Sequence, residues 1–101
     1  PWITQYDFWR ELRYFEKYVD VSRQFALHTA TLRNAELAGV GDITGSIEVG
    51  KCADMIVVDS NPLDDLCALR TVKHVVHRGR FIAAPKVKRN AVVDRELDKF
   101  L

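Results

Sequence analysis

Three histidines are the first candidates for metal chemistry in this chain, because the neutral imidazole is the commonest metal ligand among side chains. His74 and His77 lie three residues apart in a β-branched segment, whereas His28 lies in a helical pattern without a second histidine at i+3 or i+4. Side chains alternate between the two faces of a strand, so His74 and His77 cannot hold one ion together. We therefore expect no metal-binding or catalytic histidine.

Cys52 and Cys67 are the candidate nucleophiles or zinc ligands. Neither has a second cysteine or a histidine at the spacing of a zinc finger, and two cysteines are too few for a disulfide framework. We expect both to be buried thiols that act as small hydrophobic side chains. With no signal-like apolar segment near Pro1, this cysteine usage predicts a reducing, cytoplasmic setting.

Asp54 is the carboxylate with the most informative surroundings, because it lies in the stretch GSIEVGKCADMIVVD that begins at Gly45. Gly45 and Gly50 can adopt positive φ, which predicts two turns with a short strand over 46–49 between them. The apolar run 55–58 predicts a strand that is buried on both faces. We expect the carboxylate to accept two or three backbone N–H groups, which would lower its pKa and tie the turn to this strand. A catalytic base is the less favoured reading.

The first part of the chain is predicted to be helical. Over residues 4–19 large apolar side chains recur at intervals of four, three and four, which predicts a helix face formed by Phe8, Leu12, Phe15 and Val19. Asp20 or Ser22 can cap a second helix that runs to about Thr31. Another short helix to Ala38 would end at Gly39.

The second half of the chain is predicted to consist mainly of strands. Asn61-Pro62 predicts a turn, followed by a single helical turn over 63–69. Segments 72–77 and 80–82 predict a hairpin around Arg78-Gly79. The basic run 86–89 (KVKR) predicts a solvated linker, and Asn90 is the expected cap of a last helix with Val93, Leu97 and Phe100 on one face.

Composition indicates one globular, soluble unit, with 48% apolar and 29% charged residues in 101 positions. The net charge of +1 provides no field to attract nucleic acid or an anionic membrane, and no apolar run reaches the ~18 residues of a membrane span. Helices on either side of Thr31 could imitate a helix-turn-helix, but the second offers only Arg33, opposed by Glu36. We expect neither nucleic acid nor membrane as a partner.

Taken together, these motifs resemble the carboxy-terminal end of the metal-dependent amidohydrolases. The resemblance runs from about residue 22 to 82 and is most specific over 45–62; it rests on the Gly45–Asp59 stretch, Ala26-Leu27, Ala30-Thr31, Asn34-Ala35 and Val75-Val76 with Gly79. It implies an α+β chain in which 1–40 form helices from the end of a TIM-type barrel. Residues 41–84 would then supply strands of a small β-sandwich, and 85–101 a connector and a C-terminal helix. Asn61-Pro62-Leu63 is most similar to the imidazolonepropionase- and prolidase-like branch.

The resemblance also implies a parent enzyme that hydrolyses amide or related C–N bonds with one or two divalent metal ions, zinc being expected. Its ligands would come from a His-x-His pair and other barrel-strand residues that this sequence lacks, and Asp7, inside a helical pattern, is not matched to the metal-binding Asp. We therefore expect no catalytic, cofactor-binding or metal-ligating residue here and an inactive chain.

The expected partners are the missing barrel and sandwich strands, or a second copy that covers the same apolar surfaces. An alternative is a stand-alone protein-interaction module. Its anchors would be the aromatic residues of the first helix: Trp2, Tyr6, Trp9 and Tyr14.

Overall fold

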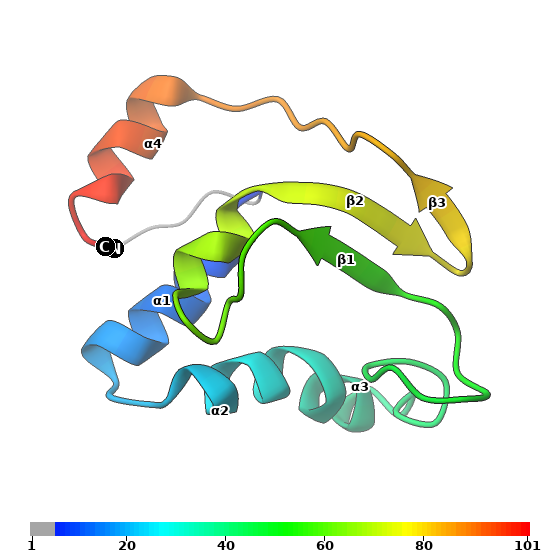
Figure 1. The fold of residues 1–101 in the computed structure, drawn as a ribbon. Helices are drawn as coiled ribbons and strands as arrows, with labels where there is room; N and C mark the ends of the chain where they lie inside the picture. Colours follow the sequence, from blue (N-terminus) through cyan, green and yellow to red (C-terminus); the bar gives the residue numbers. More distant parts are fainter. Residues whose placement is uncertain (1–5) are drawn as a thin grey trace.

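The computed structural model describes residues 6–101, which form helices around a small antiparallel sheet (Figure 1). The elements in chain order are α1 (Trp9–Tyr18), α2 (Arg23–His28), the π-helical turn η1 (Thr29–Arg33), α3 (Asn34–Leu37), β1 (Met55–Val58), the 3₁₀ helix η2 (Leu66–Arg70), β2 (Val72–His77), β3 (Arg80–Ile82) and α4 (Ala91–Asp98). The expected α+β class is confirmed. None of the helices in this described part is long and apolar enough to cross a membrane.

The first predicted helix is present but begins later than expected. α1 starts at Trp9, so Asp7 precedes the helix, and the expected start at Thr4 lies outside the described residues. Asp20 has φ of 61° and follows the end of α1, a conformation that Asp tolerates better than most residues. Ser22 is therefore the cap of α2, with its side-chain oxygen accepting from the Phe25 N–H at 3.0 Å.

The expected break near Thr31 is wrong, because α2, η1 and α3 follow one another without interruption. The Thr31 hydroxyl donates to the Leu27 carbonyl at 2.7 Å inside this run, a side-chain bond that competes with the helical pattern and accompanies the π-helical turn. The predicted stop at Gly39 is confirmed by its φ of 80°. The N–H groups of Gly39 and Val40 close the helix end on the carbonyls of Glu36 and Ala35.

Gly45 and Gly50 have the expected positive φ, but the segment between them is not a strand. The Lys51 ammonium instead holds this loop together, donating to Ser46 Oγ at 2.7 Å and pairing with Glu48 Oε2 at 2.9 Å. A strand requires a neighbouring strand for its backbone hydrogen bonds, and no such partner lies beside 46–49 in residues 6–101.

The sheet has the order β1-β2-β3, and both pairings are antiparallel. The hairpin is confirmed at the predicted residues, with positive φ at both Arg78 (50°) and Gly79 (79°), as a two-residue I′ turn requires. β1 lies at the edge of the sheet, and its Ile56 and Val57 are 52% and 41% exposed. The expectation of a strand buried on both faces is therefore wrong, because adjacent side chains point to opposite faces of β1 and both of these are exposed in the described part of the chain.

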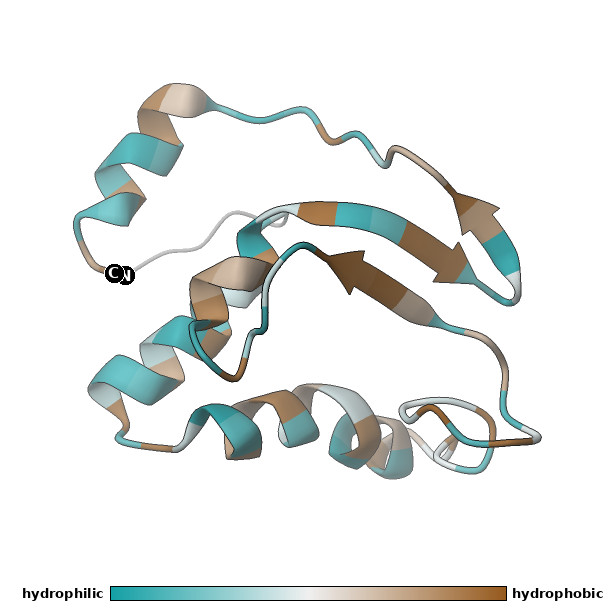
Figure 2. Cartoon of the chain, in the orientation of Figure 1, coloured by the Kyte–Doolittle hydropathy of each residue, from teal (hydrophilic) through white to brown (hydrophobic). Residues whose placement is uncertain are grey.

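The core lies where η2 packs against α1 and α2 (Figure 1). It is centred on Leu12, Ala26 and Leu66, with Leu66 completely buried. The strands of the sheet are themselves largely brown, that is apolar, in Figure 2, and several of their side chains are exposed. The radius of gyration is 14.3 Å, somewhat above the ~13 Å of a compact domain of this length.

Candidate functional site

Asp54 holds the β2–β3 turn, which is a different turn from the one expected. Its Oδ1 accepts the Arg78 N–H at 2.8 Å and its Oδ2 accepts the Thr44 hydroxyl at 2.8 Å. These two bonds, the backbone N–H of Arg78 first, lower the pKa of Asp54. The carboxylate thus accepts one backbone N–H rather than two or three, and it links the loop after α3 to the hairpin.

The histidines have separate partners. His74 Nδ1 lies 2.6 Å from the Ala83 carbonyl, and its ring packs on Phe81 with 5.0 Å between centroids. His77 is largely exposed and lies 3.6 Å from Asp54 Oδ1. His28 is exposed at the end of α2.

The expectation of two buried thiols is wrong for Cys52, which is exposed on the loop before β1. Cys67 is half-buried, and burial together with the nearby Asp65 raises the pKa of its thiol. A raised pKa reduces the thiolate fraction, so Cys67 is poorly suited to act as a nucleophile.

A polar cluster joins the two ends of the described chain. Asp7 and Arg10 are fully buried, and Arg10 Nε donates to Asp7 Oδ2 at 3.1 Å. The other Asp7 oxygen accepts from Arg89 Nη1 at 2.7 Å, while Arg10 Nη2 lies 2.9 Å from Asp98 Oδ1. Burial opposes the charge of Arg10, but Asp98 and Asp7 outweigh it and raise the Arg10 pKa. Arg89 is therefore an ion-pair partner, not part of a purely solvated linker as expected.

Two further contacts fasten α4 to the rest of the chain. The Tyr6 hydroxyl donates to Asp94 Oδ1 at 2.7 Å, and Arg70 Nη2 donates to Asp98 Oδ2 at 3.0 Å. Hydrogen bonds from Arg70, then from Arg10, lower the pKa of Asp98.

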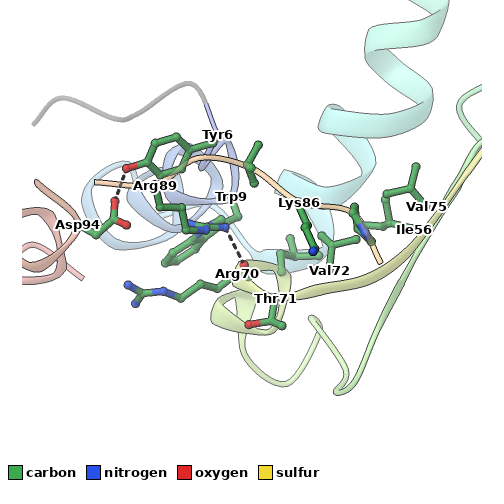
Figure 3. A pocket seen from close by; sticks show the side chains of 13 residues that line it. Tyr6, Trp9, Ile56, Arg70, Thr71, Val72, Val75, Lys86, Arg89 and Asp94 are labelled. Atoms are coloured by element: carbon green, nitrogen blue, oxygen red, sulfur yellow. Dashed lines mark hydrogen bonds between the residues drawn. The ribbon is translucent and has the colours of Figure 1, made fainter. Parts of the chain in front are cut away.

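A cavity of about 660 Å³ lies beside this cluster (Figure 3). Its wall combines α1, the sheet and the segment that leads to α4, and Trp9, Arg70 and Arg89 stand together at one end in the close-up. The Arg70 guanidinium lies 5.5 Å from the Trp9 ring, and Arg89 lies 5.0 Å from the Tyr6 ring, both within cation–π range. The residues that line the cavity include no histidine or cysteine, and their one carboxylate, Asp94, already accepts the Tyr6 hydroxyl.

A second hollow, of about 440 Å³, is an apolar groove between α1 and α2. It is lined by most of the helix face that the sequence predicts, and Phe8, Phe15 and Val19 are 50%, 43% and 58% exposed there. Phe25 of α2 forms the opposite wall and is 59% exposed. We call this surface the α1–α2 groove.

Sequence reasoning missed the buried Asp7–Arg10 pair. The available signal is an opposite-charge pair at i,i+3, which is common on exposed helix surfaces and so does not mark a buried site. The long-range partners Arg89, Asp94 and Asp98 have no local signal.

The comparisons with known proteins identify the family. Residues 5–83 match the model of the amidohydrolase family. The chain belongs to the amidohydrolase family. The resemblance stated from the sequence is thereby confirmed.

Three relatives of this amidohydrolase segment belong to the expected branch by their names. It is 30% identical over 69 residues to an imidazolonepropionase of Thermoplasma volcanium, covering 65% of the chain and 17% of that protein. A structure assigned as a prolidase from Bifidobacterium longum matches with a TM-score of 0.92 and 45% identity over 96% of the chain and 24% of that protein. A Xaa-Pro dipeptidase with bound methionine matches with a TM-score of 0.72 and 34% identity over 75% of the chain and 18% of that structure. The segment thus spans less than a quarter of the length of each of these relatives.

Proposed function

We propose that this chain is the carboxy-terminal segment of a metal-dependent hydrolase that acts on amide or related C–N bonds in the cytoplasm. The observation that carries the proposal is the similarity to the Bifidobacterium protein, which extends over 96% of this chain. Another similar structure is a prolidase complexed with N-methylphosphonate-L-proline, at 30% identity and a TM-score of 0.66. Dipeptides ending in proline are therefore the favoured substrates of the parent, ahead of imidazolone rings.

The residues present do not fit a catalytic metal site. Within residues 6–101 no three histidine, cysteine, aspartate or glutamate side chains come together in a way that could hold an ion. The polar groups that do meet are ion pairs, with Arg10 and Arg89 already occupying both oxygens of Asp7. We place the metal ligands and the chemistry in the part of the parent outside this segment, where the helices of 1–40 would close a TIM-type barrel and 41–84 would join a β-sandwich.

The exposed apolar surfaces support this division. Large apolar side chains in the α1–α2 groove and on the edge strand β1 are exposed in this chain. In the parent, the barrel would cover the groove and further sandwich strands would pair with β1. Without them, we propose that a second copy covers the groove.

The decisive experiment compares two purified proteins. The 101-residue chain and the full product of the gene that encodes it are assayed on Xaa-Pro dipeptides, and their zinc, manganese and iron contents are measured. We expect metal and hydrolysis in the full product alone. Hydrolysis together with one bound metal per chain in the 101-residue protein would overturn the proposal.

The stand-alone interaction module is weakened at two of its anchors. Trp9 and Tyr14 are only 5% and 9% exposed, so neither is free to enter a partner. Trp2 lies outside the described residues. The exposed phenylalanines of the α1–α2 groove could still bind a partner protein. They are a different set of side chains from the expected anchors.

A further inference from the structure

The segment after β3 leaves the sheet and returns to α1 without forming a helix or a strand until α4 begins. Residues 85–90 have no regular structure, and all but Pro85 are exposed. In Figure 1 this part of the chain leaves β3 and runs above β2 to α4, which lies at the opposite end of β2 from the hairpin. The family match ends at residue 83, so this segment and α4 lie beyond it. We call residues 83–101 the C-terminal strap.

The strap is attached mainly through polar groups. Leu97 is the one apolar side chain of α4 that is buried among the described residues, whereas Val92 is 65% and Val93 40% exposed. Asp94 and Asp98 bind Tyr6, Arg10 and Arg70. Arg89 pairs with Asp7, and the Lys17 ammonium donates to the carbonyls of Phe100 and Leu101. Such contacts weaken as salt rises, whereas an apolar interface does not.

Release of the strap separates Asp7 from Arg89 and Arg10 from Asp98, but Asp7 and Arg10 keep each other as partners. Arg10 is bonded to Asp7, three residues before it, and this pair lies entirely in the N-terminal part of the described chain. Release of Asp98 therefore does not leave Arg10 as an isolated buried charge, which is the costly outcome. The core around Leu66 contains no strap residue.

The strap also forms one wall of the 660 Å³ cavity, through Pro85, Lys86, Val87, Arg89 and Asp94. Trp9 of α1, which lies beside Arg89 in Figure 3, is 5% exposed while the strap is docked.

We propose that the C-terminal strap docks and releases as a unit while the sheet and core stay folded, and that its release opens the cavity beside Trp9. The strap is then a lid whose closure depends on the ion pairs of Asp98 with Arg10 and Arg70 and of Arg89 with Asp7.

Amide hydrogen exchange followed by NMR tests the proposal on the 101-residue chain. We expect α4 amides to exchange through an opening that leaves β2 amides protected. Asp98→Asn should increase α4 opening by up to about fivefold, as expected when a partly exposed charged pair is lost, with β2 unchanged. Glu96→Gln is the matched control, because Glu96 pairs with Lys99 inside the strap at 2.7 Å and its side chain has no polar partner outside the strap among residues 6–101.

A second measurement follows the cavity. In a Trp2→Phe background Trp9 is the remaining tryptophan of the two, and Asp98→Asn should increase its quenching by acrylamide while Glu96→Gln should not. Equal and parallel exchange of α4 and β2 would show a single cooperative unit and overturn the proposal. Equal effects of Asp98→Asn and Glu96→Gln on α4 exchange would also overturn it. Trp9 quenching that does not increase together with α4 opening would do the same.

Discussion

Gly45→Ala should destabilise the chain more than Gly50→Ala, because the two glycines share a backbone conformation but not an environment. Their φ values are +98° and +92°, so alanine suffers similar backbone strain at both, about 1–3 kcal/mol. At Gly45 an added Cβ would lie 2.6 Å from Ala35 Cβ and 3.0 Å from Leu32 Cα. At Gly50 it would meet nothing within 4 Å. The common strain cancels in the comparison, and the difference measures the close approach of the loop to the helix.

Overpacking of this kind costs about 1–3 kcal/mol, which is the expected difference between the two variants in free energy of unfolding. Urea unfolding followed by far-UV circular dichroism measures it, and the difference should also appear as a melting temperature lower by about 4–8 °C per kcal/mol. Equal destabilisation by the two substitutions would refute the close approach. A larger effect at Gly50 would show that the loop is held elsewhere, for example through Lys51.

Two further predictions concern Asp54 and the α1–α2 groove. Hydrogen bonds from the Arg78 N–H and the Thr44 hydroxyl lower the pKa of Asp54, so their stabilisation is present above the ordinary aspartate pKa and lost as the pH falls through the folded-state pKa. Asp54→Asn should therefore flatten the acid limb of the stability profile measured by urea unfolding, and an unchanged limb would contradict the bonds. In sedimentation velocity we expect the chain to self-associate, and Phe15→Glu to weaken this more than Phe81→Glu, a control on β3 whose side chain is more exposed (59% against 43%). A wild-type monomer at high concentration would be evidence against the groove as an interface.

Local signals predicted the turns and caps well. The hairpin at Arg78-Gly79, the stop at Gly39 and the cap at Asn90 were all found at the expected residues. Each depends on backbone angles or on a side chain that bonds within three residues, so the sequence window contains the whole cause. The Ser22 cap follows the same logic, although Asp20 could not be excluded from the sequence.

Features that depend on distant residues were not predictable. The segment 46–49 has strand-like residues, yet it forms no strand here because strand formation requires a partner and a salt-bridged loop is the alternative. The contact between Arg10 and Asp98 joins residues 88 positions apart, and charged residues on helices normally indicate solvent. Cys52 is exposed for a related reason, since none of the residues 6–101 covers it on the loop before β1.

The two faces of α1 show why the apolar pattern alone misplaced the core. Trp9, Arg10 and Tyr14 are buried toward η2 and the C-terminal strap, whereas Phe8 and Phe15 of the predicted inner face line an open groove. A helix with buried groups on one side and an apolar stripe on the other normally lies between two layers. Residues 6–101 supply one of these layers, and the chain spans 24% of the Bifidobacterium protein that it matches. We therefore propose that the second layer belongs to the rest of the parent, and that the stripe correctly indicates burial in the parent even though it fails in the segment.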